Sequence, residues 1–236
     1  MSAEKIHLFD TPLLLSRNLG LSVEQRALKR ILDIFMSLIG IIVTSPLMLL
    51  IALAVKLYDH GPVFYRQQRL TLHGKSFQIY KFRSMCVNSE KDGARLASKH
   101  DSRITPIGYV LRNLHLDELP QLFNVLKGDM SMVGPRPERE DIMKEYEKEI
   151  PEFVYRLKVK AGLTGYAQVY GKYNTTPYDK LKLDLFYIEN YSFLLDLKLL
   201  FMTVKIFFQK EVSEGVEDTQ MNALKTSTKE NNSEEK

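Results

Sequence analysis

Two adjacent carboxylates, Asp117 and Glu118, stand among leucines in the stretch LHLDELPQLFNVLKGDMSMVGPRPE, residues 114–138. A carboxylate can act as a nucleophile, a general base or a Mg²⁺ ligand. Taken alone the pair says little, because acidic residues at the start of a helix are usually caps or partners of the helix dipole. Pro120 suits the first turn of a helix, so we expect both carboxylates at a helix N-terminus.

Several basic side chains are candidates to bind a multiply charged anion: Lys81, Arg83, Arg112 and Arg136. Arg136 is the most informative of them, because Pro135 and Pro137 fix its backbone and reduce the entropy lost when its guanidinium is placed. Each cation alone would be read as a solvated surface charge. Together with the two carboxylates and a long apolar segment, they indicate phosphate chemistry on a lipid-borne substrate.

The apolar segment runs from Ile34 to Val55 and is long enough for a helix that spans a membrane. Pro46 in its middle should break or bend the helix, and Thr44 and Ser45 can bond the carbonyls that the proline frees. Basic residues flank both ends, so the positive-inside rule gives no orientation. We therefore expect a re-entrant helix that bends at Ser45 and Pro46 and leaves on the face it entered. A proline-kinked spanning helix is the alternative.

The segments on either side of this helix carry simpler signals. Ser22 suits the N-cap of a short surface helix that precedes the apolar segment. Residues 61–85 predict a β-hairpin that turns at His73-Gly74. On its second strand Lys81 and Arg83 fall on one face.

The second half of the chain predicts further helices and a loop. The helix near the two carboxylates should bury one apolar face, made of Leu116, Leu119, Phe123 and Leu126. Residues 138–158 predict a charged helix, residues 159–180 a loop rich in glycine and tyrosine, and residues 181–192 the start of a final helical region.

Residues 194–210 predict a helix with two apolar faces, whereas a simple surface helix has one. One face consists of Leu197, Phe201, Val204 and Phe208, and the other of Leu195, Leu199, Met202 and Ile206. Two faces suggest that one packs on the protein and one meets lipid. Burial of the helix on both sides is the alternative.

Composition sets broad limits. The chain has 236 residues, 44% of them hydrophobic, and a formal net charge of +4, which suits a phosphate-rich partner or an anionic membrane surface. Cys86 is its one cysteine, so no intramolecular disulfide can form. Its five histidines are scattered, and no pair has the spacing of metal ligands. No nucleotide-binding glycine motif is present, and no nucleic acid partner is expected.

A series of motifs occurs in order: KRILD at 29–33, the Ser45-Pro46 break, GPVFYRQQR, KFRSM, LDELPQLFNVLKGDMSMVGPRPE, AGLTGYAQV and FYIENYS. In these the chain resembles the bacterial sugar transferase family, the monotopic polyprenyl-phosphate phosphoglycosyl transferases, over about residues 26 to 210. Longer relatives carry membrane helices before this region. Residues 1–28 are too short for that block, so the chain resembles the minimal form.

The resemblance implies a reaction in which a UDP-sugar gives its sugar-1-phosphate to undecaprenyl phosphate and UMP is released. It also implies Mg²⁺, membrane lipid as a partner, and a site on the cytoplasmic face of the bacterial inner membrane. Such a step begins the synthesis of a capsule, an exopolysaccharide or a surface glycan, with downstream glycosyltransferases as possible partners. The motifs name neither the sugar nor the polymer.

The resemblance also implies roles for individual residues. Asp117 would be the nucleophile that forms a phospho-sugar intermediate, with Glu118 assisting as metal ligand or acid–base partner. Lys81, Arg112 and Arg136 match positions that hold phosphates, and Asp184 matches a further acidic position. Two departures concern fine geometry, since His115 stands where Ser or Thr is usual and Thr71 replaces a glycine.

The expected fold is therefore α+β and mainly helical, with a re-entrant membrane helix, a small β-hairpin, and a cytoplasmic catalytic domain that has interfacial helices. Its divisions would be an extension (1–28), the membrane helix (29–58), the catalytic domain (59–211) and a disordered tail (212–236), which is polar and acidic. Two rival functions remain at this point. One is a non-catalytic membrane-surface scaffold of a polysaccharide assembly complex, and the other is a different phosphotransferase.

Overall fold

The computed structural model describes residues 4–8, 11–15, 20–87, 89, 101–171 and 175–207, with the first two ranges as backbone only. The predicted tail, 212–236, lies outside these residues. The helices are α1 (Val23–Asp59), α2 (Pro106–Asn113), α3 (Gln121–Lys127), α4 (Glu140–Glu149), α5 (Tyr166–Tyr170), α6 (Pro177–Glu189) and α7 (Phe193–Phe207). The strands are β1 (Glu4–Leu8), β2 (Thr11–Leu15), β3 (Phe64–Leu70), β4 (Ser76–Phe82), β5 (Ser131–Val133) and β6 (Gly162–Thr164). The 3₁₀ turns are η1 (Leu72–Gly74), η2 (Leu116–Glu118) and η3 (Pro151–Lys158).

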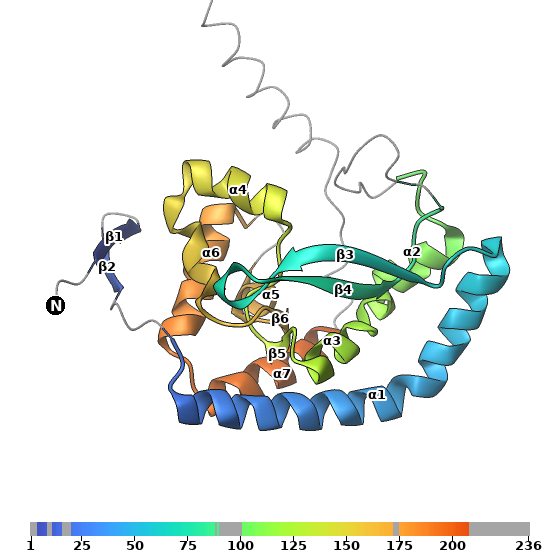
Figure 1. The fold of residues 1–236 in the computed structure, drawn as a ribbon, viewed down its shortest axis with the longest axis horizontal. Coiled ribbons are helices and arrows are strands. Elements are labelled where there is room, and N and C mark those ends of the chain that lie inside the picture. Colours follow the sequence, from blue (N-terminus) through green and yellow to red (C-terminus); the bar gives the residue numbers. More distant parts are fainter. Residues whose placement is uncertain are drawn as a thin grey trace, which may run out of the picture.

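The strands form three two-stranded sheets within these ranges: β1 with β2 and β3 with β4, both antiparallel, and β5 with β6, parallel. In Figure 1 the β3–β4 hairpin crosses the middle of the molecule, with α1 along one side and α4 on the other. The main apolar core lies between these layers and includes Phe77, Val125, Phe153 and Leu185. The chain is thus mainly helical with small sheets, which confirms the coarse fold prediction.

Helix α1 begins at a capping box. The Ser22 Oγ accepts the Gln25 N–H at 3.1 Å, and the Gln25 Oε1 accepts the Ser22 N–H at 2.9 Å. This confirms the predicted N-cap. The separate surface helix was wrong, because α1 continues without interruption from Val23 to Asp59. No glycine or proline separates the charged first turns from the apolar segment.

The bend predicted at the proline is present. Pro46 lies inside α1, and Figure 1 shows the second half of the helix turning away from the direction of the first. Pro46 has no N–H to offer the Ile42 carbonyl, and the Ser45 Oγ–H donates to that carbonyl at 2.9 Å. The Thr44 Oγ1–H donates to the Gly40 carbonyl at 2.7 Å. The Ser45 bond to the freed carbonyl confirms the prediction, whereas the Thr44 bond goes to a carbonyl that Pro46 does not free.

Much of α1 faces away from the protein. Its most apolar stretch is long and hydrophobic enough to cross a membrane, and only 17% of that stretch is buried. The exposed side chains include Phe35, Ile42, Val43, Leu49 and Leu50. An uncovered apolar surface of this kind is costly in water and indicates association with a membrane. Re-entry into one leaflet stays a prediction.

The β3–β4 hairpin confirms the prediction for residues 61–85. Its register pairs Phe64 with Phe82 at one end and Leu70 with Ser76 at the other. His73 adopts a left-handed conformation in the turn, with φ of 59°. Thr71, which departs from the family's glycine, is buried and donates its hydroxyl to the Asp129 carbonyl at 3.0 Å. That bond ties the turn to the segment before β5.

The predicted apolar face of the helix near the carboxylates was confirmed only in part, because Leu116 and Leu119 pack against a second core cluster but Phe123 does not share their burial. Helix α3 starts only at Gln121, because residues 116–118 form the separate turn η2. This shift rotates the face, so Leu122 and Val125 are buried while Phe123 is 41% exposed. The two carboxylates therefore lie in the turn that leads into the helix.

Two further segments divide more finely than the sequence predicted. Residues 138–158 form α4 and then η3, because Pro151 cannot continue the preceding helix. The expected loop at 159–180 contains β6 and α5 as well as the start of α6. Short elements such as these depend on the partners they pack against.

Helix α7 confirms the prediction of two apolar faces with different surroundings. Leu199 is fully buried, and Leu195 packs against the main core. On the other face Leu197, Phe201 and Val204 are 39%, 71% and 56% exposed. Burial on both sides is thereby excluded for these residues, and contact of the exposed face with lipid stays a prediction.

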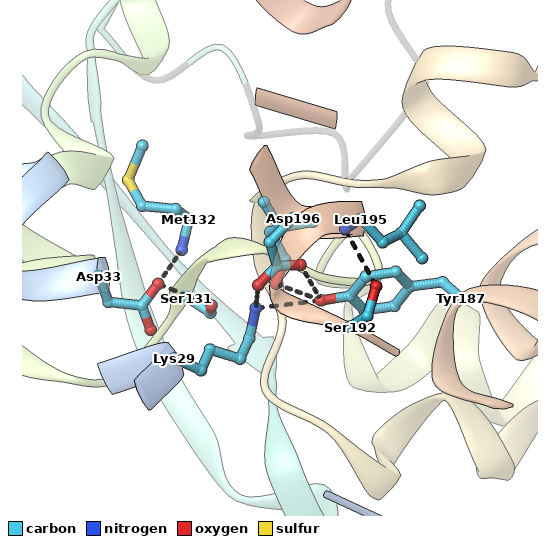
Figure 2. Close-up of polar contacts among 9 residues, drawn as sticks. Lys29, Asp33, Ser131, Met132, Tyr187, Ser192, Leu195 and Asp196 are labelled. Atoms are coloured by element: carbon cyan, nitrogen blue, oxygen red, sulfur yellow. Dashed lines mark hydrogen bonds and ion pairs between the residues drawn. The ribbon is translucent and has the colours of Figure 1, made fainter. Parts of the chain in front are cut away.

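A buried polar cluster joins the N-terminal part of α1 around Lys29 and Asp33, called its base below, to α6, α7 and β5 (Figure 2). The Lys29 Nζ donates to Asp196 Oδ2 at 2.7 Å and to the Tyr187 hydroxyl oxygen at 3.0 Å. The Tyr187 hydroxyl donates to Asp196 Oδ1 at 2.7 Å. One turn along α1, the Asp33 carboxylate accepts the Ser131 hydroxyl at 2.9 Å and the backbone N–H of Met132 at 2.8 Å.

Removing one member of this cluster should destabilise the protein more than removing two. We expect Lys29→Met to cost roughly 3–5 kcal/mol of unfolding free energy, because it leaves Asp196 buried without its cation. The double variant Lys29→Met/Asp196→Leu should recover most of that loss. Urea unfolding in detergent, followed by circular dichroism, measures both, with Lys198→Met on the exposed side of α7 as the control.

The exposed face of α7 gives a second prediction. Phe201→Glu should weaken binding to anionic lipid vesicles without lowering the unfolding temperature, because a charge replaces an apolar side chain that contacts no core residue. Val154→Glu, at a 44% exposed apolar position on η3, is the matched control. Vesicle flotation of both variants compares them. Unchanged flotation of Phe201→Glu would exclude lipid contact by this face.

Candidate active site

Two cationic side chains from different parts of the fold form ion pairs with Glu118. The Lys81 Nζ on β4 lies 2.7 Å from Glu118 Oε1. The Arg136 Nη2, in the loop after β5, lies 2.5 Å from the same oxygen, and the Arg136 Nη1 lies 3.3 Å from Oε2. Three of the residues singled out in the sequence are therefore brought together.

The turn η2 carries the dyad, Asp117 and Glu118, and is called the dyad turn below. A buried side-chain amide holds this turn against β4. The Asn124 Oδ1 on α3 accepts the Tyr80 backbone N–H at 3.0 Å, and its Nδ2 donates to the Gln78 carbonyl at 2.8 Å. A side chain thus takes the place of a neighbouring strand along β4. This contact fixes α3, and the turn before it, beside the strand that carries Lys81.

The loop that carries Arg136 is held by close backbone packing and by a second arginine. A Cβ on Gly134 would collide with the Lys160 carbonyl oxygen, so this position requires glycine. The Arg156 Nη2 donates to the Arg136 carbonyl at 3.0 Å. The prolines on both sides of Arg136 restrict it further, as the sequence predicted.

Asp117 differs from its neighbour. It is 8% exposed, and in the part of the chain that the structure describes its carboxylate makes no hydrogen bond or ion pair. Burial raises its pKa above the ordinary range, and Lys81 opposes that effect. Arg112, in the last turn of α2, also lowers this pKa without bonding to the carboxylate.

Glu118 has the opposite pKa shift. Burial disfavours its charge, but Arg136 and Lys81 outweigh burial and hold its pKa well below the usual range. The two neighbouring carboxylates therefore have pKa values moved in opposite directions. Such a separation is typical of acid–base and nucleophilic pairs in active sites.

His115 lies just before the dyad turn in a left-handed conformation, with φ of 52°. Its side chain is exposed, and its charge lowers the pKa of Asp117. Histidine is among the residues that adopt this conformation more readily than a β-branched residue does. His115 therefore affects both the shape and the electrostatics of the dyad turn.

Arg83 does not join the cluster, contrary to the prediction that grouped it with Lys81. Strand β4 ends at Phe82, and the Arg83 guanidinium pairs with Asp59 at the C-terminal end of α1. A Cβ on Gly61 would collide with this guanidinium, which shows how closely it is packed. In the structure Arg83 connects the C-terminal end of α1 to the β3–β4 hairpin.

Asp184 also lies away from the dyad, although it supports the site. It is buried on α6 and accepts the Arg156 Nε–H at 2.6 Å. Burial raises its pKa, and Arg156 opposes that effect. Because Arg156 also holds the Arg136 carbonyl, Asp184 acts on the loop through one intermediate residue.

The sequence reasoning missed a second charged cluster next to Arg136. Glu138 pairs with Lys180 on α6 and lies 3.8 Å from the Arg156 Nη1. Burial disfavours its charge, but Lys180 and Arg156 outweigh burial and lower its pKa. The position of Glu138, directly after the Pro-Arg-Pro loop, was the one available signal.

The residues partly fit a divalent cation. The described ranges contain no group of three or more His, Cys, Asp or Glu side chains that could hold a metal. Both oxygens of Glu118 already accept bonds from cationic side chains, whereas the Asp117 carboxylate is free of them within those ranges. A Mg²⁺ ion commonly binds through one carboxylate together with substrate phosphates and waters. Asp117 could provide that carboxylate.

Comparison with known proteins gives a consistent family. The sequence pattern of the bacterial sugar transferase family matches residues 24–210. The chain is 46% identical over 181 residues to a UDP-N-acetylgalactosamine-undecaprenyl-phosphate N-acetylgalactosaminephosphotransferase of Aeromonas hydrophila, covering 75% of this chain and 43% of that protein. It is 43% identical over 204 residues to a UDP-glucose:undecaprenyl-phosphate glucose-1-phosphate transferase of Klebsiella pneumoniae, covering 84% of this chain and 42% of that protein.

A shorter relative matches along most of its length. It is the uncharacterized sugar transferase EpsL of Bacillus subtilis, 41% identical over 192 residues, which cover 81% of this chain and 91% of that protein. The chain spans less than half the length of the other two relatives, 43% and 42%. The matched region nevertheless contains every site residue described above.

The different surroundings of the two carboxylates predict opposite effects on stability. Above pH 6, Asp117→Asn should leave the unfolding temperature unchanged or raise it, because burial disfavours the charge that the change removes. Any such gain should disappear as the pH falls to about 2–3, where aspartate is protonated in both the folded and the unfolded chain. Thermal unfolding across this pH range measures it.

Glu118→Gln should instead lower stability by roughly 1–3 kcal/mol, because it leaves Lys81 and Arg136 facing each other without their counter-charge. Glu140→Gln, at an exposed ion pair with Lys144, is the control and should change little. The same thermal measurement compares the two. A Glu118→Gln protein as stable as the wild type would contradict the described ion pairs.

Proposed function

The chain belongs to the bacterial sugar transferase family, and we propose that it transfers sugar-1-phosphate from a UDP-sugar to undecaprenyl phosphate, with release of UMP. The observation that carries this proposal is the buried Asp117 beside a carboxylate that holds two cations. A multiply charged phosphate donor matches such a site, and an apolar helix matches a lipid acceptor. The activities that the relatives' names record are of this kind.

The reaction has two displacements. An oxygen of Asp117 attacks the β-phosphorus of the donor, and a new P–O bond forms while the bond to the bridging oxygen breaks. That oxygen leaves with UMP, and the sugar-1-phosphoryl group stays on Asp117. An oxygen of undecaprenyl phosphate then attacks the same phosphorus and releases the Asp117 carboxylate. Asp117 has the required freedom, because no ion pair in the described ranges engages it.

The cations have separate tasks in this proposal. Lys81 and Arg136 are already assembled on Glu118, so they are in place before substrate arrives. They stabilise negative charge on the transferring phosphoryl oxygens, and Arg112 adds to the positive potential at Asp117. Glu118 positions the cations, which limits its freedom to act as a proton carrier or a metal ligand.

We further propose that Mg²⁺ takes part, held by Asp117 and by oxygens of the donor diphosphate. Such an ion supplies charge neutralisation at the phosphoryl oxygens. In this arrangement the prediction of Glu118 as a second ligand is weakened, because its oxygens already accept bonds from Lys81 and Arg136.

The site is proposed to lie on the cytoplasmic face of the inner membrane. The bent helix α1 would enter and leave one leaflet, and the exposed face of α7 would rest in the interface. Residues 59–211 would then form the catalytic domain, at the depth of the acceptor's phosphate. The product would begin a capsule, an exopolysaccharide or a surface glycan, extended by glycosyltransferases.

An assay of UMP release from a panel of UDP-sugars, with and without undecaprenyl phosphate, tests the proposal. The wild type should release UMP from at least one sugar, and Asp117→Asn should abolish release while remaining folded. With undecaprenyl phosphate omitted, the wild type should carry a sugar-phosphate adduct on Asp117, visible by mass spectrometry. Lipid binding without any UMP release would favour the scaffold, and release of a different nucleotide would favour another phosphotransferase.

A further inference from the structure

Arg69 on β3 has an unusual environment for an arginine. Its Nη2 donates to Gln67 Oε1 at 2.5 Å, which holds the guanidinium in place through a neutral amide. Its Nε is buried and has no hydrogen-bond partner. Across the residues that the structure describes, no carboxylate forms an ion pair with it. An unsatisfied buried group of this kind costs free energy, so its presence calls for an explanation.

Other arginines packed into the protein have partners that match their charge. Acidic partners are found for Arg83, Arg103, Arg136, Arg139 and Arg156, and Arg30 donates to the carbonyls of Val125 and Leu126. The Arg83 Nη1 is also buried without a hydrogen-bond partner, but the ion pair with Asp59 balances the charge of that guanidinium. Arg69 departs from that arrangement.

The charges around Arg69 are predominantly positive. Burial lowers its pKa, and Arg136 and Arg139 lower it further. Glu138 opposes this effect, but its carboxylate is already paired with Lys180 and lies beside Arg156. Arg136, Arg139 and Arg156 each pair with a carboxylate of their own, whereas Arg69 has none within the described residues, and an anion bound beside it would offset the repulsion from Arg136 and Arg139.

The hairpin register places Arg69 on the face that reaches the dyad. Arg69 pairs with Phe77 and Tyr65 pairs with Lys81, so the side chains of Arg69 and Lys81 project from the same face of the sheet. Lys81 meets Glu118 at one end of this face. At the other end the backbone N–H of Leu70 donates to the Glu138 carbonyl at 2.9 Å, two residues after Arg136. This face of the β3–β4 hairpin therefore runs from Lys81, beside the dyad, to Arg69, beside the segment that follows the Arg136 loop.

We propose that Arg69 binds the nucleotide half of the donor, at its phosphate group, with Gln67 orienting the guanidinium. This inference rests on the proposed function and extends the same site along β3. A phosphate oxygen accepting from the Arg69 Nε–H would satisfy the orphaned donor and neutralise the surplus charge. The free phosphate of UMP, the first product, would bind there too.

The position of Arg69 favours the soluble donor over the lipid. Its end of β3 packs near α4, a charged helix, and Figure 1 shows α4 on the side of the hairpin opposite α1. The exposed apolar side chains lie on α1 and on α7, which runs beside it in contact. A lipid phosphate arriving from that apolar surface would reach Lys81 and Arg136 first.

Kinetics of Arg69→Gln in the full-length protein test this proposal. We expect the KM for the UDP-sugar and the inhibition constant for UMP to rise by about 10- to 100-fold, the usual cost of losing a charge-assisted bond. The KM for undecaprenyl phosphate should stay unchanged, and Arg69→Lys should restore part of the donor affinity. The matched control is Arg66→Gln on the same strand, since Arg66 lies over the Tyr80 ring at 5.3 Å on the opposite face.

Two outcomes would overturn the proposal: an unchanged KM for the donor, or a rise confined to the KM for undecaprenyl phosphate, which would assign Arg69 to the lipid. A titration of UMP into the Asp117→Asn protein, with and without Arg69→Gln, separates this inference from the proposed function. Loss of UMP binding on Arg69→Gln would support the nucleotide site even if no UDP-sugar is turned over. Unfolding temperatures of all variants should match within a few degrees, because Arg69 has no acidic partner to lose.

Discussion

The direction of α1 depends on polar contacts at its base. A helix that leaves most of its apolar side chains uncovered gains little from packing against the protein, so other contacts must fix its angle. Lys29 reaches α6 and α7, and Asp33 reaches β5 (Figure 2). The Arg30 guanidinium donates to the C-terminal carbonyls of α3 at 2.7 Å. Of these elements, α3 directly follows the turn that carries Asp117 and Glu118, and β5 directly precedes the Arg136 loop. The base of the apolar helix and the site are therefore positioned by the same few side chains.

Within the site, two neighbouring carboxylates are given different chemistry by their surroundings. Glu118 is ionised by its cations, and those ion pairs assemble strands and loops from distant parts of the chain. Asp117 is buried without such a partner, so burial disfavours its charged form and raises its pKa. A reactive carboxylate of this kind costs folding free energy, which the ion pairs beside it help to offset. Stability and reactivity are thus divided between residues 117 and 118.

The Arg136 loop is restrained from both sides. Its guanidinium is held by Glu118, and its carbonyl is held by Arg156, which Asp184 in turn fixes from α6. Buried pairs of this type restrict the geometry of the groups that they join. The same arrangement places Arg69 beside Arg136 and Arg139, with no carboxylate of its own in the described ranges. An anionic substrate would complete the balance of charge.

Local sequence determined the features that depend on neighbours along the chain. The Ser22 cap, the bend at Pro46, the β3–β4 hairpin and the two faces of α7 follow from turn chemistry, missing donors and side-chain periodicity, and all were predicted. The family motifs likewise located the dyad. Tertiary structure decided the partners, because a charge in the sequence carries no record of what it will face. In the folded protein Arg83 pairs with Asp59, and Asp184 pairs with Arg156. Phe123 is exposed because α3 starts only at residue 121. Contacts between residues far apart in the sequence determine where these side chains lie. A local sequence pattern contains no information about such contacts.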